Sequence, residues 1–233
     1  MQPKFQLSYH WTDDLMTYAT AAKGFRSGFF YSGNFTKAES TWNYEAGLKS
    51  ELADHRVVLN FDVFHINYSD QQFTSITSTP PYRQTSNIPS TRINGAEAEL
   101  TARPISNLTL GAGLGYTDAT VNDGTAGPYT PRFTADLSAE HSLPVVADWR
   151  WVSRVDFRYQ DAQYLRRENT YEIGPKDYVN LRVGVDNGRW KIAAYGNNLA
   201  NTRQAFQFDN VGFGYLRYNN NPRTYGGEVA VRF

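Results

Sequence analysis

Alternation of apolar and polar residues constrains this chain most, because it recurs from one end to the other. The final segment, TYGGEVAVRF at residues 224–233, places Tyr225, Val229 and Phe233 on one face and Glu228 and Arg232 on the other. Successive side chains of a β-strand point to opposite faces, so the pattern predicts a strand with one apolar and one polar face. About eleven such segments of roughly 8–13 residues occur, near the length of a tilted strand that crosses a bilayer. They begin near residues 4, 15, 42, 56, 91, 107, 132, 149, 177, 190 and 224.

The polar faces of these segments carry charges of both signs. Glu45 and Lys49 share one segment, and Arg154, Asp156 and Arg158 share another. In a soluble β-sandwich the polar face is the wet exterior, whereas in a membrane barrel it lines the lumen. Alternation by itself therefore leaves both folds open.

The lengths of the links between segments favour the membrane barrel. Short links lie at 12–14, 53–55, 103–107, 144–148 and 186–189, and long polar links at 27–40, 69–90, 120–131, 161–176 and 199–222. The two kinds alternate without exception, as do the short periplasmic turns and long extracellular loops of outer-membrane barrels. Greek-key sandwiches do not require this order. Trp149 and Trp151 follow a short link, where an interfacial aromatic girdle is expected.

Composition argues against several other classes of protein. Lys and Arg number 23 and Asp and Glu number 23, so there is no basic footprint for nucleic acid. Cysteine is absent, which excludes disulfides and thiolate metal sites. The mean hydropathy is −0.57, and no apolar run reaches the length of about 18 residues that a transmembrane helix needs. Barrel strands escape that test because only alternate residues face lipid.

Six motifs, taken in sequence order, resemble those of TonB-dependent outer-membrane receptors. They are YATAAKGFRSGFF (18–30), NYEAGLKSEL (43–52), FDVFHINYSDQQ (61–72), NGAEAEL (94–100), NNLANTR (197–203) and PRTYGGEVAVRF (222–233). Each motif is loose, but six in order are specific, and they match the C-terminal half of the family's barrel. Phe29 departs from the family pattern, which commonly repeats glycine after Gly28.

The resemblance implies an all-β, antiparallel, up-and-down barrel of about 22 strands with a plug in its lumen. Such receptors import scarce nutrients, for example ferric siderophores, cobalamin or oligosaccharides, with energy from TonB. Residues 1–233 are then expected to be the C-terminal part of the barrel, with the plug domain, the TonB-contacting segment and the first barrel half absent. The implied partners are those missing parts, TonB, lipid and lipopolysaccharide, and the barrel-assembly machinery. The implied location is the bacterial outer membrane, and no cofactor or enzymatic activity is implied.

Counting segments supports the same expectation. A closed bacterial barrel with both termini in the periplasm has an even number of strands. Tracing back from Phe233, on the short-link side, through about eleven strands places Met1 on the long-link, extracellular side. We therefore expect two open edges, in an open curved sheet or in a partial barrel with a strained seam. A passive porin, a ligand-binding barrel and a soluble carbohydrate-binding sandwich remain as alternatives.

The pattern assigns residues to three roles. The polar-face residues expected to face the lumen are Glu45, Lys49, Asp62, Glu97, Glu99, Asp136, Arg154, Arg158, Arg182, Glu228 and Arg232. The residues expected to face outward include Leu48, Phe61, Leu137, Phe157, Leu181 and Val231. The resemblance implies that Tyr225, Val229, Val231 and Phe233 form the outer-membrane assembly signal. Candidate ligand contacts in the aromatic, arginine-containing loops are Tyr31, Phe35, Tyr164, Phe213, Tyr215 and Arg217.

Two further expectations concern local features. Phe64 and Ile66 enter the polar face of their segment, which points to a bulge there. Catalytic and metal sites are not expected, because no spacing orients a base on a nucleophile and the four histidines are scattered. The glycines of GAGLG (111–115) lie inside an alternating segment rather than between a strand and a helix, so they do not predict a phosphate-binding loop.

Overall fold

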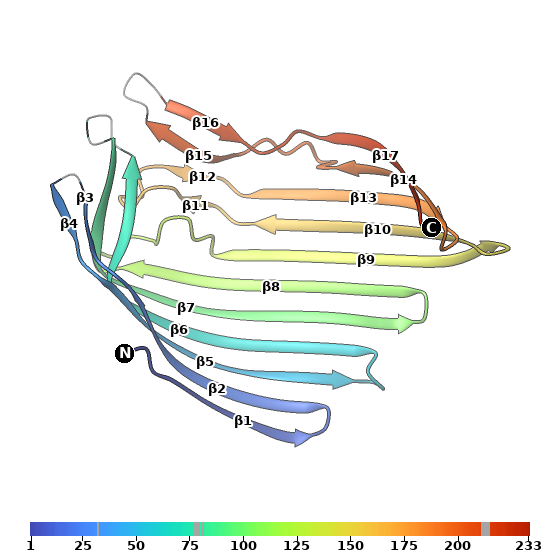
Figure 1. Cartoon of the computed structure of the whole chain (residues 1–233), viewed down its shortest axis with the longest axis horizontal. Helices are drawn as coiled ribbons and strands as arrows, with labels where there is room; N and C mark the ends of the chain where they lie inside the picture. The colour runs from blue at the N-terminus through green and yellow to red at the C-terminus, as the bar shows by residue number, and fades with distance from the viewer. Residues whose placement is uncertain (32, 77–79, 81, 211–214) are drawn as a thin grey trace.

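The computed structural model contains one 11-stranded antiparallel sheet in which every strand pairs with its neighbour along the sheet (Figure 1). It describes residues 1–233 except 32, 77–79, 81 and 211–214. In spatial order the strands are β1 (Lys4–Thr12), β2 (Leu15–Arg26), β5 (Glu39–Leu52), β6 (Val57–Ile76), β7 (Arg83–Ile105), β8 (Leu108–Val121), β9 (Phe133–Val146), β10 (Trp149–Gln160), β13 (Lys176–Asp186), β14 (Trp190–Asn197) and β17 (Thr224–Val231). The described residues include no helix long and apolar enough to cross a membrane.

The sheet is open, as the odd strand count predicted. β1 pairs only with β2 and β17 only with β14, so each leaves one edge of the sheet unpaired among the described residues. The chain starts at the end of the sheet where the long links lie and stops at the end with the short turns (Figure 1). The strand order contains no Greek-key crossover, which excludes the sandwich.

Three of the long links fold into short hairpins beyond the sheet. These are β3 (Phe29–Tyr31) with β4 (Asn34–Thr36), β11 (Gln163–Tyr164) with β12 (Glu172–Ile173), and β15 (Ala205–Asn210) with β16 (Tyr215–Asn219). The expected link at 69–90 is largely strand instead, because β6 and β7 stay paired as far as Ile76 and Arg83. Polar Ser, Thr and Gln side chains are compatible with such a ribbon, since neither of its faces needs to be apolar outside the bilayer.

The expected bulge at Phe64–Ile66 is wrong. β6 pairs in unbroken register with β5 and with β7 through this stretch, so Phe64 keeps its place on the polar face. Gly95 lies directly opposite, and a Cβ there would meet the Phe64 ring. The glycine therefore makes room for the ring, a cross-strand arrangement that holds register without a bulge.

The turn between β5 and β6 has an unusual backbone. Ala53, Asp54 and His55 follow one another with φ of 55°, 54° and 59°. Non-glycine residues adopt this left-handed conformation at a cost of roughly 1–2 kcal/mol each. The turn thereby folds His55 back toward the end of β5.

Among the described residues, the sheet has no apolar core between layers. Large apolar side chains of its convex face are exposed, among them Phe61 (40%), Leu137 (44%) and Leu181 (41%). The largest fully buried side chains, Ile88 and Thr36, instead lie beyond the sheet's centre, where β4 packs on the extension of β7. An exposed apolar band is what a surface in contact with lipid requires.

Candidate lumen wall and ligand-binding loops

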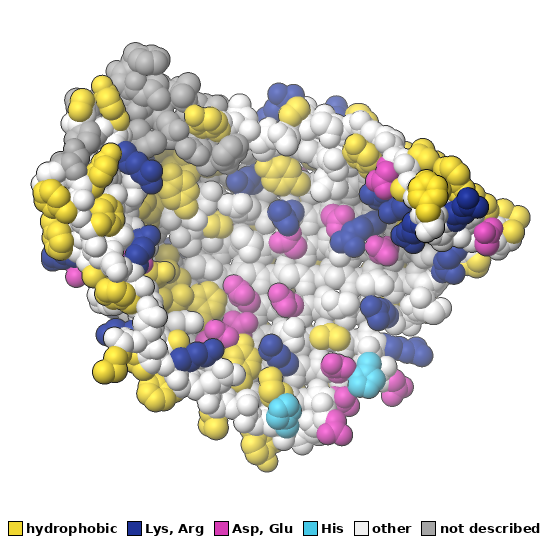
Figure 2. All heavy atoms as spheres, in the orientation of Figure 1, with side chains coloured by type: hydrophobic (Ala, Val, Ile, Leu, Met, Phe, Trp, Pro, Cys, Tyr) yellow, Lys and Arg dark blue, Asp and Glu magenta, His cyan; other side chains and the backbone are white. Residues whose placement is uncertain are grey.

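The register joins the polar residues of all eleven strands into one continuous face. Asp62 of β6 lies opposite Glu97 of β7, and Asp136 of β9 lies opposite Arg158 of β10. Ten of the eleven predicted polar-face residues lie in strands on this face, and Arg232 follows β17 directly. Figure 2 shows Lys, Arg, Asp and Glu side chains across the middle of the sheet. That this face lines a closed lumen stays a prediction.

The outward-facing residues form the complementary face. Leu48 pairs with Phe61, and Phe157 pairs with both Leu137 and Val179. Trp11, Trp151 and Trp190 lie exposed near the short-turn end of the same face. An aromatic girdle at the periplasmic surface of the outer membrane is expected at this position.

Four carboxylates, Glu45, Asp62, Glu97 and Glu99, form an acidic group on the polar face of β5, β6 and β7. The Tyr18 hydroxyl donates to Glu45 Oε1 at 2.7 Å, and Asn60 Nδ2 lies 3.5 Å from Glu99 Oε2. No ion pair of these four carboxylates is found among the described residues. Like charges opposite one another destabilise a sheet, so the acidic group favours a cationic partner.

A second charged group, on β9, β10, β13 and β17, is neutralised internally. Arg158 Nε lies 2.6 Å from Asp136 Oδ1, and Arg154 lies 2.7 Å from Asp156 and 3.4 Å from Glu140. Arg182 pairs with Glu228 two strands away. This half of the polar face therefore carries charge without a strong net field.

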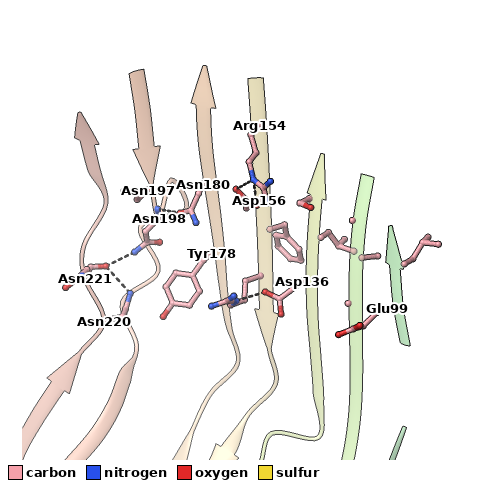
Figure 3. A pocket seen from close by; sticks show the side chains of 18 of the residues that line it. Glu99, Asp136, Arg154, Asp156, Tyr178, Asn180, Asn197, Asn198, Asn220 and Asn221 are labelled. Atoms are coloured by element: carbon pink, nitrogen blue, oxygen red, sulfur yellow. Dashed lines mark hydrogen bonds and ion pairs between the residues drawn. The ribbon is translucent and has the colours of Figure 1, made fainter. Parts of the chain in front are cut away.

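A hollow of about 960 Å³ lies over the second group, with Glu99, Asp136, Arg154 and Tyr178 on its wall (Figure 3). The asparagines of the NNLANTR motif and of residues 220–221 close one side of it. Asn198 is buried, its backbone N–H donates to Asn180 Oδ1, and its amide donates to the carbonyls of Thr202 and Asn221 at 3.0 Å. These hydrogen bonds tie both ends of the last long link to β13. Sequence reasoning missed Tyr178 and Asn180, which come into place only through strand pairing.

Small buried clusters hold the long links together. Leu165, Ile173 and Ala205 are each less than 5% exposed and form one cluster. The amide of Asn169 accepts from the Ala126 N–H at 2.7 Å and donates to the Ala126 carbonyl at 3.0 Å. The links after β8, β10 and β14 are thus connected to one another above the sheet.

Asp123 shows how one of these links is ordered. Its carboxylate accepts from the Thr125 hydroxyl at 2.6 Å and from the Thr125 N–H at 3.0 Å. These hydrogen bonds, with help from Arg167 at 3.4 Å, lower the pKa of the Asp123 carboxyl. The charged form of Asp123 is therefore part of the folded loop.

The candidate ligand contacts are spread over three links. Tyr31 and Phe35 are exposed on the β3–β4 hairpin. Tyr164 lies in β11, and its carbonyl accepts from the Tyr129 N–H at 2.7 Å. Phe213 lies outside the described residues, and Tyr215 and Arg217 lie in β16 with only their backbone described.

The hairpin of β3 and β4 also borders a hollow of about 490 Å³. Its wall includes Arg26, Phe29, Tyr31, Gln72 and Arg83. Glu39 holds Arg26 at 2.8 Å, whereas Arg83 makes no ion pair within the described part of the chain. Two guanidinium groups beside aromatic rings suit a ligand that combines negative charge with flat, polarisable groups.

The sequence model of the protein family "TonB dependent receptor-like, beta-barrel" matches residues 2–199 of this chain. The chain belongs to the TonB-dependent receptor family. It is 27% identical over 243 residues to the ferric-pyoverdine M114 receptor PbuA of Pseudomonas sp. strain M114, which covers 95% of this chain and 28% of PbuA. It is also 28% identical over 121 residues to the metal-pseudopaline receptor CntO of Pseudomonas aeruginosa, covering 51% of this chain and 17% of CntO.

Solved structures agree on the fold. The ferric yersiniabactin uptake receptor FyuA of Yersinia pestis superposes with a TM-score of 0.85 at 21% identity, over 99% of this chain and 37% of FyuA. The chain thus spans only part of the length of the relatives it matches, from 17% of CntO to 37% of FyuA. As a TonB-dependent receptor barrel it is an outer-membrane protein, and the family consists of transporters rather than enzymes.

Proposed function

We propose that this chain is part of the barrel wall of an energised transporter that brings a metal–siderophore complex across the outer membrane. One observation carries the proposal: a register that keeps one polar and one apolar face across eleven strands of a TonB-dependent receptor barrel. The similarity to a ferric-pyoverdine receptor over 95% of the chain supports a chelated metal as the cargo. The partial match to a metal-pseudopaline receptor supports the same class.

The two edges of the sheet support completion by further barrel strands. β1 and β17 each present a ladder of unpaired backbone groups, and lipid offers such groups no hydrogen bonds. In the working receptor each edge pairs with a strand of the other barrel part. The exposed apolar side chains of Tyr225 and Val229 on β17 then face lipid beside that junction, and with Val231 and Phe233 they form the assembly signal.

The acidic group is an argument for a plug in the lumen. Glu45, Asp62, Glu97 and Glu99 share one face, and they make no ion pair within the part of the chain that the structure describes. A plug carrying Arg or Lys at its surface would neutralise them. The internally paired half of the polar face needs no such neutralisation. The plug is therefore anchored more firmly on β5–β7 than on β9–β13.

Cationic residues at the long-link end of the convex face are an argument for contact with lipopolysaccharide. Lys23, Trp42, Asn67 and Arg92 pair in one row across β2, β5, β6 and β7, on the convex face at its long-link end. Directly below lies a shallow apolar groove of about 630 Å³. Cationic groups above an apolar band match a phosphorylated lipid of the outer leaflet.

Uptake measurements test the proposed function. Deleting the gene should abolish energy-dependent accumulation of iron-55 supplied as a ferric siderophore, and removing TonB should do the same with the gene intact. A passive porin would instead give uptake that persists without TonB. Arg26→Ala with Arg83→Ala should raise the concentration needed for half-maximal uptake, whereas the pair Lys191→Ala and Arg189→Ala, at the short-turn end, should leave it unchanged.

A further inference from the structure

Three side chains that can bind a metal ion meet at the short-turn end of the sheet, far from the long links. They are Asp14 in the β1–β2 turn, Glu51 at the end of β5 and His55 in the β5–β6 turn. One ligand atom from each lies within 4.8 Å of the other two. His55 Nδ1 lies 2.6 Å from Glu51 Oε2 and 3.9 Å from Asp14 Oδ1.

The backbone holds the three residues in place. The Glu51 N–H donates to the Asp14 carbonyl at 2.8 Å, and the register Leu15↔Ser50 continues on from this bond. The left-handed run at Ala53, Asp54 and His55 turns the imidazole back over Glu51. The cluster therefore joins two neighbouring hairpins rather than forming within one flexible segment.

We propose that Asp14, Glu51 and His55 bind a divalent transition-metal ion of the Zn²⁺ class. One imidazole nitrogen and two carboxylate oxygens are a ligand set that zinc accepts, with water completing the tetrahedron. Bond lengths of about 2.0–2.1 Å put ligand atoms roughly 3.3 Å apart in that geometry. The three side chains are exposed, and their ligand atoms need to move by about 1 Å to adopt this tetrahedral geometry. The imidazole disfavours Ca²⁺ and Mg²⁺, which prefer oxygen ligands alone.

The local charge is suited to a cation. Carboxylate oxygens of Glu51 and Asp14 lie 2.6 Å and 3.9 Å from His55 Nδ1, and the negative field of two carboxylates favours a metal ion. Among the described residues no Lys or Arg pairs with Asp14 or Glu51.

The site lies at the end of the sheet opposite to the long links. In outer-membrane barrels the short turns face the periplasm, so the metal would be drawn from that compartment. A bound ion would fasten the β1–β2 hairpin to the β5–β6 hairpin. The site is independent of the proposed cargo and would exist whether or not the protein transports a siderophore.

Calorimetric titration with Zn²⁺ tests the proposal. The protein is purified in detergent from outer membranes, without a histidine tag, at near-neutral pH. Zinc should bind saturably to the unmodified protein. In His55→Ala the stoichiometry should fall by one ion per molecule, or the affinity of that site should be at least tenfold weaker. Glu51→Gln should weaken the same site, and it keeps the size of the side chain.

His141→Ala is the matched control, because His141 also lies toward the short-turn end but contacts Asn107 rather than carboxylates. The control should bind zinc as the unmodified protein does. Zinc binding that is absent up to about 1 mM, or that is the same in His55→Ala and Glu51→Gln as in the unmodified protein, would overturn the proposal. Heat-modified mobility on a gel checks that each variant is folded.

Discussion

The membrane-spanning sheet and the links above it follow opposite rules. In the sheet, apolar side chains such as Leu137 and Leu181 are exposed on the convex face, and charged residues such as Asp136 and Arg158 lie opposite one another on the concave, polar face. In the links, apolar side chains such as Leu165 and Ile173 are buried in a small cluster. The difference follows from the solvent. Lipid accepts apolar surface without cost, whereas water drives it into clusters.

Placing a charge on the convex face should have the largest effect. Leu137→Arg in the middle of β9 should destabilise the protein in a bilayer by about 2–4 kcal/mol, because Arg would sit in hydrocarbon. Ser138→Arg, one residue along and on the concave face, should change stability far less. Urea unfolding in lipid vesicles measures both. Equal losses for the two variants would contradict the two-faced sheet.

Opening the cluster in the links should have a smaller and local effect. Leu165 is 4% exposed, and Leu165→Ala should cost about 2 kcal/mol, at the low end for a buried leucine because the cluster is small. Hydrogen exchange should become faster across residues 161–175 and near Ala205, while amides of the sheet keep their protection. Faster exchange throughout the sheet would mean that links and sheet form one cooperative unit.

Glycines on the concave face distinguish tight from open places within the sheet. A Cβ at Gly95 would meet the Phe64 ring and lie 2.6 Å from the Tyr116 carbonyl oxygen, whereas at Gly113 the nearest atom is 3.9 Å away. Gly95→Ala should therefore destabilise the protein by about 1 kcal/mol, and Gly113→Ala should be nearly neutral. Unfolding midpoints of the two variants give the comparison. A neutral Gly95→Ala would show that Phe64 moves aside freely.

Removing an ion pair of the concave face should change stability only slightly. Arg158 and Asp136 lie 2.6 Å apart, but their side chains are 69% and 57% exposed. Exposed pairs contribute about 0.2–1 kcal/mol, so Asp136→Asn should lower stability by about 0.5 kcal/mol, less at high salt. A loss several times larger would indicate that water is excluded from this part of the concave face.

Strong acid should loosen the link after β8. Since the folded link lowers the pKa of Asp123, its contribution is complete above the ordinary Asp pKa of about 3.9 and is lost as the pH falls through the lowered value. Thr125→Val should shift this loss to higher pH by removing the first of the hydrogen bonds. An NMR titration of the Asp123 carboxyl measures the shift. An unchanged midpoint in Thr125→Val would refute the role of the hydroxyl.

Sequence periodicity was sufficient to predict the sheet. The predicted starts near residues 4, 15, 149, 190 and 224 coincide with β1, β2, β10, β14 and β17, because alternation is a local signal that lipid on one side enforces. The starts of β5 and β7 were placed late, at 42 and 91 rather than Glu39 and Arg83. Beyond the bilayer both faces are wet, so the alternation that marks a strand is lost.

The contacts between distant segments could not be predicted. Asp14 is distant in sequence from Glu51 and His55, and it meets them only because β2 pairs with β5. The asparagine network around Asn198 depends on where the chain returns after the last long link. Phe64 on the polar face led to the prediction of a bulge, because the sequence does not show that Gly95 of the neighbouring strand leaves space for its ring.

Site-directed spin labelling along β9 tests the two-faced sheet most directly. Residues 1–233 contain no cysteine, so a single cysteine at any of positions 135 to 140 gives this part of the protein one labelling site. Labels at 135, 137 and 139 should be relaxed by lipid-soluble oxygen, and labels at 136, 138 and 140 should not, with a period of two residues. The same lipid exposure at all six positions, or the reverse phase, would contradict a sheet whose apolar face meets the membrane and whose charged face turns inward.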